Sequence, residues 1–274
     1  MAGTGVVITT TRHPRVARAR RLLKRAFRQD ARLFLVEGPQ NVTEALGETG
    51  ALHELFVTED AAARHRELVA RAADAGVPVH VTSGAVLADL TQTVTPQGLV
   101  GVAGFRDVPL DDVLAGSPRL VAVLAEIRDP GNAGTVMRTA DAAGVDAVVL
   151  TDASVDPYNP KCTRAAAGSH FHVPFVVGGD PVDTLRRLRA AGLRVVGATA
   201  VGDASLYDDA LAGPTAWVFG NEARGLAPEV LAECDGTVAV PIHGRAESLN
   251  LATAAALCLY ASARQQRTPG GCRS

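Results

Sequence analysis

Short apolar runs alternate along the chain with segments of helical periodicity, and this alternation predicts an α/β protein. In the first hundred residues, apolar runs typical of strands occupy 33–37, 52–58, 77–81 and 99–104. Apolar residues at helical spacing predict helices at 42–46, 61–75 and 85–90. Together these segments indicate a compact α/β domain of about 100 residues.

A second series begins after the proline-, aspartate- and glycine-rich segment 107–118, which is typical of a linker. Strands are predicted at 120–125, 145–150, 172–177, 193–198, 216–219 and 238–241. Helices are predicted at 133–143, 181–191 and 249–264, with a helical turn at 164–168. This order indicates an open, mostly parallel sheet covered on both faces. We therefore predict a first domain at 1–106, a linker at 107–118 and a second domain at 119–274.

The segment 12–27 predicts an amphipathic helix with a cationic outer face. Eight Lys and Arg residues occur between Arg12 and Arg28 with no carboxylate until Asp30, although the chain has a net charge of −2. A cationic helix face is often merely solvated, but this density favours contact with nucleic-acid phosphates. The candidate phosphate-binding residues are Arg12, Arg15, Arg18, Arg21, Lys24 and Arg25.

The four cysteines are far apart and form no C-x-x-C pair, so neither a disulfide framework nor a zinc site is predicted. No charged and apolar leader opens the chain, and no apolar run approaches the roughly 18 residues of a membrane span. These features predict a cytoplasmic protein with no metal and no membrane partner.

Three loops of the second domain are polar where a plain connection need not be. The first, at 126–138, places Asn132 at the start of a helix and Arg138 almost two turns further along. An ordinary explanation exists, because Asn132 could cap the helix and Arg138 could pair with Asp141. The loop lacks the G-x-G-x-x-G spacing of a dinucleotide-binding turn, which argues against an ordinary Rossmann methyltransferase.

The second loop, at 219–226, follows a buried strand and brackets Asn-Glu between two glycines, so its backbone can approach a ligand closely. It places Glu222 directly beyond the strand. The third loop, at 240–251, leads into an alanine-rich helix and contains Ser248 and Asn250. Ser248 could simply cap that helix and Asn250 could be a solvated residue of its first turn, but this leaves the string Glu-Ser-Leu-Asn-Leu unexplained.

The order and spacing of these strings strongly resemble the signature motifs of the SpoU (TrmH) family in the SPOUT methyltransferase superfamily, over roughly 120–264. Residues 10–105 look like the small, ribosomal-protein-like RNA-binding domain often fused ahead of it. Phe34-Leu-Val-Glu-Gly38 and Thr95-Pro-Gln-Gly98 carry this second resemblance. The resemblance implies an α/β catalytic domain with a parallel sheet and a deep trefoil knot, which general folding rules disfavour.

The resemblance also implies that S-adenosylmethionine is the cofactor and lies bent in the knotted loops, held largely by backbone groups. The positions that match the family's cofactor-binding residues are Thr199, Gly220, Val240, Ile242 and Leu249. Main-chain contacts to an adenine ring would explain the small residues in these loops.

The implied reaction is methyl transfer to a ribose 2′-hydroxyl of structured RNA. Arg138 matches the family's central catalytic residue, and Asn132 and Glu222 would orient it. Ser248 and Asn250 would hydrogen-bond around the hydroxyl and the cofactor. A guanidinium ordinarily stays protonated, so Arg138 either acts in an unusual environment or stabilises a developing alkoxide.

The family acts as a homodimer in which both protomers contribute to each site. The Leu- and Ala-rich helix at 249–264 fits such an interface, and it fits packing inside its own domain equally well. The separate first domain favours structured ribosomal RNA, foremost 23S ribosomal RNA, over transfer RNA. A catalytically silent RNA-binding protein on the same fold and a methyltransferase acting on a base are the alternatives.

Overall fold

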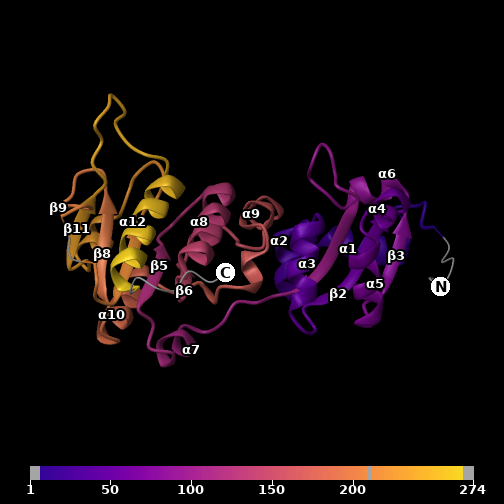
Figure 1. The fold of residues 1–274 in the computed structure, drawn as a ribbon, viewed down its shortest axis with the longest axis horizontal. Helices are drawn as coiled ribbons and strands as arrows, with labels where there is room; N and C mark the ends of the chain where they lie inside the picture. Colours follow the sequence, from indigo (N-terminus) through magenta and orange to yellow (C-terminus); the bar gives the residue numbers. More distant parts are fainter. Residues whose placement is uncertain (1–6, 209–210, 268–274) are drawn as a thin grey trace. The chain divides into compact units, whose positions relative to one another are not determined.

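The computed structural model describes residues 7–208 and 211–267, and the chain divides into two compact units (Figure 1). The first unit comprises Met1–Phe105 together with Tyr158–Phe171, and the second comprises Arg106–Pro157 with His172–Ser274. The sequence placed 158–171 in the second domain, whereas this segment packs with the first unit. Phe34 lies 4.8 Å from Tyr158, measured between ring centroids, and Tyr158 stacks on Phe105 at 3.6 Å.

The first unit contains a four-stranded sheet in the order β1-β4-β2-β3. Its strands are β1 Leu33–Glu37, β2 Leu52–Thr58, β3 Val79–Thr82 and β4 Leu99–Gly104. The central strand β4 is antiparallel to β1 and β2, while β2 and β3 are parallel. The four predicted strands are therefore confirmed.

The helices of the first unit are α3 Pro39–Gly47, α4 Glu59–Arg64, α5 Arg66–Asp74, α6 Gly84–Asp89 and α9 Pro160–Ala166, with a 3₁₀ turn η1 Ser169–Phe171. The single helix predicted at 61–75 is two helices, because the backbone of His65 leaves the helical region at φ −117° and ψ 45°. Thr58 begins α4, where its hydroxyl accepts a hydrogen bond from the N–H of Ala61.

The basic segment also forms two helices instead of the one predicted at 12–27, namely α1 Pro14–Arg21 and α2 Arg25–Ala31. Lys24 between them is extended, with φ −99° and ψ 131°. Arg28 is buried, and its Nη1 donates a hydrogen bond of 2.8 Å to the carbonyl of Leu22, one of the groups that the end of α1 leaves without an intrahelical partner. The break therefore has a stabilising contact of its own.

The second unit contains a seven-stranded sheet in the order β7-β6-β5-β10-β8-β11-β9, and every pairing in it is parallel. Its strands are β5 Leu120–Leu124, β6 Ala147–Leu150, β7 Phe175–Val177, β8 Arg194–Thr199, β9 Ala204–Ser205, β10 Thr215–Phe219 and β11 Gly236–Ala239. Its helices are α7 Leu110–Ala115, α8 Pro130–Ala143, α10 Pro181–Ala190, α11 Pro228–Leu231 and α12 Leu251–Gln266. The predicted α/β class with a parallel sheet is confirmed, and the sequence missed the short elements β9, α11 and α7 of this unit. The trefoil knot stays a prediction from the resemblance.

The segment predicted as a linker at 107–118 contains α7, which belongs to the second unit. Leu110 and Val113 of this helix are buried in that unit's apolar core. The sequence prediction failed because the prolines, aspartates and glycine of this segment hide two apolar residues at helical spacing.

Helix α12 packs against α8 and against the central strands of the sheet, as the yellow and magenta helices of Figure 1 show. The indole Nε1 of Trp217 on β10 donates a hydrogen bond of 2.8 Å to the hydroxyl of Ser262 on α12. Both side chains are fully buried, so this bond satisfies two polar groups that would otherwise be costly to bury. One face of α12 is thereby fixed inside its own domain.

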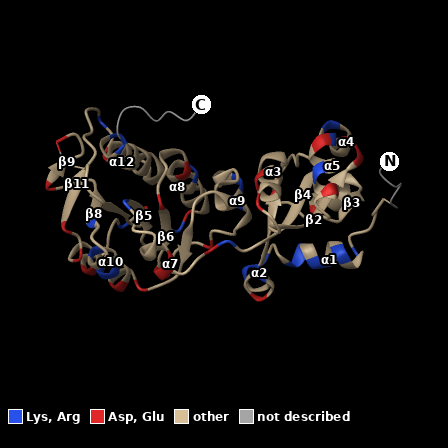
Figure 2. Cartoon of the chain, turned by 60° about the horizontal axis from the view of Figure 1, so that its bottom comes forward, with Lys and Arg blue, Asp and Glu red and all other residues tan. Residues whose placement is uncertain are grey.

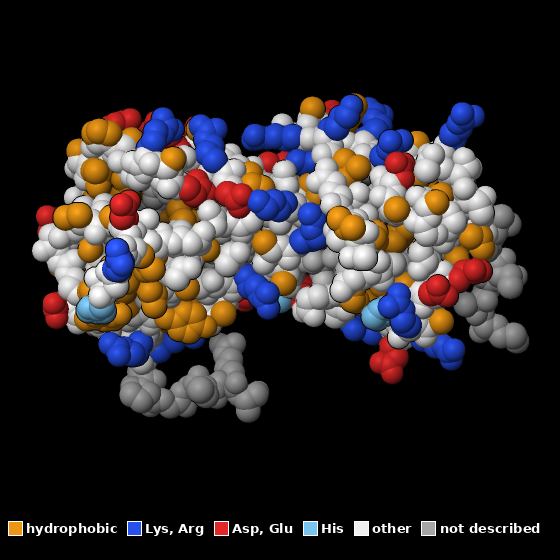
Figure 3. Space-filling view, turned by 90° about the horizontal axis from the view of Figure 1, so that it is seen from above, with side chains coloured by type: hydrophobic (Ala, Val, Ile, Leu, Met, Phe, Trp, Pro, Cys, Tyr) orange, Lys and Arg blue, Asp and Glu red, His pale blue; other side chains and the backbone are white. Residues whose placement is uncertain are grey.

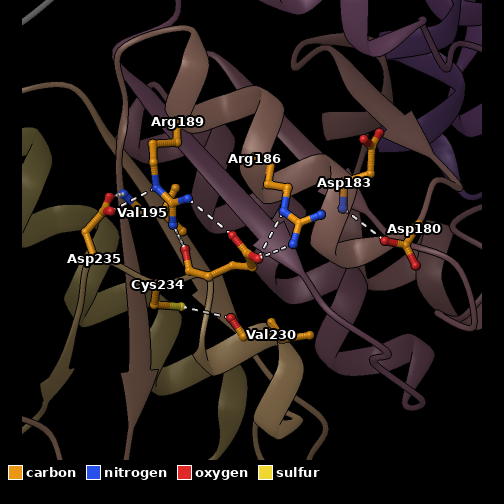
Figure 4. A network of polar contacts seen from close by, with 9 residues as sticks. Asp180, Asp183, Arg186, Arg189, Val195, Val230, Cys234 and Asp235 are labelled. Carbon is orange, nitrogen blue, oxygen red and sulfur yellow. Dashed lines mark hydrogen bonds and ion pairs between the residues drawn. The ribbon is translucent and has the colours of Figure 1, made fainter.

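A network of charges ties α10 to the segment between α11 and β11 (Figure 4). Glu233 accepts hydrogen bonds from Arg186 and Arg189, and these bonds lower the pKa of its carboxyl group. Asp235 accepts a bond of 2.9 Å from Arg189 and one of 2.8 Å from the backbone N–H of Val195. The network holds the sheet where β8 and β11 begin, opposite to the ends where ligands gather in parallel sheets.

Candidate functional site: a cavity where three loops meet

A cavity of about 640 Å³ lies in the second unit beyond the carboxyl ends of β8, β10 and β11. Loops from adjacent parallel strands meet at this edge of an open sheet, which is the usual place for a ligand. All five residues predicted to bind a cofactor line the cavity: Thr199, Gly220, Val240, Ile242 and Leu249. Four of the five predicted catalytic residues line it as well: Asn132, Glu222, Ser248 and Asn250.

Glu222 holds the first loop in place. Its Oε2 accepts a hydrogen bond of 3.1 Å from the backbone N–H of Arg128, and its Oε1 accepts one of 3.0 Å from that of Asp129. The side chain of Asn132 donates a third bond of 3.2 Å to Oε1. Burial raises the pKa of Glu222, but these hydrogen bonds outweigh it and leave the pKa below its usual value. Glu222 is therefore an anion that fixes a loop.

The side-chain amides of Asn132 and Asn250 extend the hydrogen bonding from Glu222, and each amide donates toward Glu222. Asn132 donates through Nδ2 to Glu222, so its Oδ1 is free to accept, and Nδ2 of Asn250 donates to it at 3.0 Å. Oδ1 of Asn250 in turn accepts bonds of 2.9 and 3.4 Å from the N–H groups of Ala252 and Thr253 at the start of α12. A single chain of oriented hydrogen bonds thus links the three polar loops.

The second loop has a role that the sequence did not reveal. Asn221 donates from Nδ2 to the carbonyl of Glu126 at 3.0 Å, and Arg224 lies 3.4 Å from the Glu126 carboxylate. Glu126 has φ +57°, a conformation that a non-glycine residue adopts only when its surroundings impose it. The position of Asn221 between two glycines was the only signal in the sequence.

Gly220 is required by the close approach of the loop to itself. A Cβ at this position would lie 2.3 Å from the carbonyl carbon of Gly225 and 2.4 Å from the nitrogen of Leu226. Backbone bonds of 2.9 and 2.8 Å between Asn221 and Gly225 close the turn. The glycine that the resemblance assigned to cofactor contact therefore also has a structural reason to be glycine.

Arg138 is the one predicted catalytic residue that does not line the cavity. It lies exposed on α8, and its side chain makes no hydrogen bond or ion pair with any described residue. The ordinary explanation from the sequence, pairing with Asp141, is not found, since the Asp141 carboxylate contacts His172 at 2.8 Å. Ser248, which does line the cavity, is exposed and has no hydrogen-bond partner among the described residues.

The six predicted phosphate-binding residues are all exposed on α1, on α2 and beside them. Figure 2 shows blue segments of the ribbon along α1. Arg15 and Arg18 pair with Glu54, whose side chain is 14% exposed, and Arg21 lies over the ring of Phe27 at 4.0 Å. The side chains of the other three form no ion pair with described residues; these are Arg12, Lys24 and Arg25. Two of these three cations, Lys24 and Arg25, lie at the break between the helices, and Arg12 lies just before α1.

Within the described residues, no three His, Cys, Asp or Glu side chains form a group that could hold a metal ion. No helix there is long and apolar enough to cross a membrane. Burial raises the pKa of the Cys234 thiol to about 11 and that of Cys258 to about 12, so both are protonated at neutral pH.

Comparison with known proteins agrees with this geometry. Residues 119–260 match the SpoU rRNA Methylase family, and residues 13–101 match an MRM3-like substrate binding domain. The 23S rRNA (guanosine(2553)-2′-O)-methyltransferase RlmP of Bacillus subtilis is 33% identical over 253 residues, which cover 92% of this chain and 97% of the relative. The 23S rRNA (guanosine-2′-O-)-methyltransferase RlmB of Neisseria meningitidis is 33% identical, over 78% of this chain and 87% of the relative.

Solved structures extend the likeness to both parts of the chain. The AdoMet-bound rRNA methyltransferase from Sinorhizobium meliloti has a TM-score of 0.83 and 31% identity, and covers 95% of this chain and 98% of its own. The SpoU methyltransferase AviRb from Streptomyces viridochromogenes with AdoMet has a TM-score of 0.80 and 30% identity, over 92% and 98%. The predicted S-adenosylmethionine-dependent RNA methyltransferase is thereby confirmed at the level of the family. The chain belongs to the SpoU rRNA methylase family.

Proposed function

We propose that this protein transfers the methyl group of S-adenosylmethionine to a ribose 2′-hydroxyl of 23S ribosomal RNA. One observation carries the proposal: loops at 126–132, 219–226 and 240–250 meet at a single cavity and are joined there by the bonds from Glu222 through Asn132 to Asn250. Loops that merely connect strands to helices do not need hydrogen bonds to other loops far away in the sequence.

The cavity suits the donor in size and in chemistry. Its volume of about 640 Å³ lies within the range of about 300–1,000 Å³ typical of cofactor sites. Leu226, Val238 and Ile242 supply apolar wall for an adenine ring, and Thr199 and Asn250 supply polar groups for a ribose and an amino acid. When bound, S-adenosylmethionine supplies a methyl group already activated on a sulfonium, so the protein must mainly align the acceptor.

The chain's own residues provide that alignment. The relay keeps Asn132 and Asn250 in one orientation, and the unpartnered hydroxyl of Ser248 is available to a ribose or to the donor. Arg138 supplies a cation for the developing alkoxide or the neighbouring phosphate. Glu222, which accepts two hydrogen bonds from the backbone of the first loop, positions that loop.

Ribosomal RNA is favoured over transfer RNA by the relatives that match both parts of the chain. RlmP and RlmB are named for 23S ribosomal RNA, and the first part of this chain matches a substrate binding domain. A Synechocystis relative with 32% identity is named a tRNA/rRNA methyltransferase. The experiment below therefore includes transfer RNA as a competing acceptor.

A homodimer would complete the site. Arg138 is absent from the lining of the cavity within one chain, and α12 leaves Leu257 and Tyr260 exposed while its other face is buried. Hydrophobic side chains also gather on the face of the second unit that Figure 3 displays. A second copy covering α12 would remove these side chains from water and could bring its own Arg138 to the cavity.

The test uses methyl-labelled S-adenosylmethionine with protein-free 23S ribosomal RNA and with bulk transfer RNA. We expect label in the ribosomal RNA, resistant to alkali at the modified linkage because a methylated 2′-oxygen cannot attack its phosphate. An RNA fragment carrying a 2′-deoxy nucleotide at the mapped position should accept none. Label on that deoxy fragment would indicate a base methyltransferase, and label on transfer RNA alone would reject the ribosomal substrate.

A further inference from the structure

A second cavity, of about 320 Å³, lies within the first unit and is distinct from the cavity beyond the parallel sheet. Two strings that carried the resemblance of this part of the chain meet there, since Gly38 and Gln97 both line it. Arg164 of α9 completes the wall. The volume lies at the lower end of the range for small-ligand sites, about 300–1,000 Å³, and suits one nucleotide-sized group.

Two glycines with positive φ, Gly38 and Gly98, lie beside Gln97 at this cavity. Gly38 has φ +89°, and a Cβ there would lie 2.7 Å from Oε1 of Gln97. Gly98 has φ +88°, and a Cβ there would lie 2.5 Å from that of Ala61 and 2.8 Å from the hydroxyl of Thr58. Both glycines are required by their conformation, and Gly98 is required by space as well. The Gln97 side chain lies against Gly38, directly after β1.

Several polar groups around the cavity have unused hydrogen-bonding capacity. The hydroxyl oxygen of Thr93 is buried and has no hydrogen-bond partner, and the Gln97 amide forms no hydrogen bond with a described residue. Arg164 uses one N–H, in a bond of 3.0 Å to Glu37, and its side chain is 30% exposed. Buried polar groups normally have partners, so a ligand that supplies one is the simplest explanation for the Thr93 hydroxyl, while the exposed Gln97 amide is open to the same ligand.

The chemistry of these groups matches the edge of a nucleobase better than a phosphate. The Gln97 amide offers both donors and an acceptor, the pattern with which amide side chains contact base edges. Asn41 donates one N–H of Nδ2 to the carbonyl of Glu37 at 2.9 Å, which leaves its second N–H and its Oδ1 for a ligand. The charge of Arg164 is already balanced by Glu37, so the cavity has no surplus cation for a free phosphate. Val94, which is 99% exposed between two lining threonines, adds an apolar surface at the rim.

The geometry points to a recognition site for one unpaired nucleobase of the substrate RNA, read by Gln97, Asn41 and Arg164. Sequence-specific RNA recognition generally uses unstacked bases of this kind. The inference rests on the proposed function only in taking RNA as the substrate. The site lies outside the methyl-transfer cavity and does not use the free cations of α1 and α2.

The test follows side-chain amide signals in ¹⁵N–¹H spectra of the full-length protein during titration with AMP, CMP, GMP, UMP and ribose 5-phosphate. We expect the Gln97 and Asn41 signals to shift with one or two of the nucleotides and not with ribose 5-phosphate. Gln92, exposed in the same loop and outside the cavity, should not move. Equal shifts with ribose 5-phosphate would indicate a phosphate site and overturn the inference. Shifts confined to the Asn132 and Asn250 signals would also overturn it.

Two matched variants connect the site to RNA. Gln97→Ala should weaken binding of the selected nucleotide and raise the KM for RNA about tenfold, the loss of one base contact, with kcat nearly unchanged. Gln92→Ala should change neither quantity. S-adenosylmethionine binding, measured by calorimetry on both variants, separates the hypothesis of a base-recognition site from that of the methyl-transfer function. If Gln97→Ala binds donor and RNA like the unmodified chain, the base site is rejected while the proposed function stands.

Discussion

The environment of Glu222 decides which chemistry this residue can perform. A general base needs a pKa near the working pH. The carboxylate of Glu222 already accepts three hydrogen bonds, two of them from the backbone of the first loop, and its pKa is lowered. Its contribution is therefore electrostatic and positional.

The lowered pKa of Glu222 gives a prediction for the pH dependence. A carboxyl whose pKa is depressed by folding stabilises the native site above its unfolded pKa, and this contribution is lost only as the pH falls through the lowered value. Donor affinity measured by calorimetry should therefore show no step from Glu222 between about pH 5 and pH 9. A step near neutrality that disappears in Glu222→Gln would instead make Glu222 a proton acceptor.

Glu222→Gln gives a second prediction at this scale. The new amide would direct N–H groups at one of the backbone donors of Arg128 or Asp129, so the first loop would lose its anchor. We expect the rate of methyl transfer to fall by at least about tenfold through misalignment. Glu229→Gln, at the start of α11 and outside the cavity, is the matched control and should keep its rate. Equal rates in the two variants would contradict the positional role.

At the scale of elements, α12 begins at a residue with two functions. Asn250 caps the helix through Oδ1 and joins the relay through Nδ2, and two substitutions separate these functions. Asn250→Asp keeps the capping oxygen but turns an acceptor toward Asn132, whose own amide is already committed to Glu222. We expect this variant to keep its melting temperature and lose most of its activity.

The companion variant Asn250→Ala should lose both functions, with about 1 kcal/mol of stability lost with the cap. Asp180→Ala removes the cap of α10 in the same unit, away from the cavity, and serves as the control. It should lower the melting temperature in calorimetry without lowering activity. If Asn250→Asp were fully active, the relay would have no catalytic value.

The break between α1 and α2 determines which cations remain for RNA. Lys24 and Arg25 have no ion pair among the described residues, whereas Arg18 is balanced by Glu54. Replacing Lys24 and Arg25 with Ala should reduce the slope of log affinity against log salt by about 1.5, close to 0.7–0.9 per lost phosphate contact. The double variant Arg18→Gln with Glu54→Gln keeps the net charge and should leave the slope unchanged. If the slope changed in the Arg18 and Glu54 double variant and not in the Lys24 and Arg25 variant, the phosphates would contact α1 instead.

Regular elements were predictable from the sequence, while their interruptions and their partners were not. Periodicity gives strands such as β5 and β10 because both faces of a buried parallel strand are apolar. It could not give the break at Lys24, which depends on a tertiary contact of Arg28, nor α7 within the apparent linker. At the site, the motifs indicated Asn132, Glu222 and Asn250. The direction of their hydrogen bonds and the role of Asn221 required three loops to be placed together.

At the scale of the whole molecule, we propose that a complete site needs two chains. One cavity holds four of the five predicted catalytic residues, and the fifth, Arg138, lies exposed on α8. The exposed Leu257 and Tyr260 of α12 mark a surface that a second copy could cover. In a twofold dimer the same surface of each copy contacts the other. If Arg138 of one copy reaches the cavity of its partner, the partner's Arg138 therefore reaches the cavity of the first copy.

Subunit mixing tests this arrangement. Asn132→Ala damages the cavity and Arg138→Ala removes the cation, so each variant alone should be inactive. Arg138→Ala should still bind the donor. If Arg138 acts in the partner's site, a mixed dimer has one doubly damaged site and one intact site. Equal mixing with free exchange should then restore roughly a quarter of the activity of the unmodified protein. If Arg138 serves its own cavity, every site in the mixture carries one defect and no activity returns, so the absence of recovery in a demonstrably mixed dimer would reject the shared site.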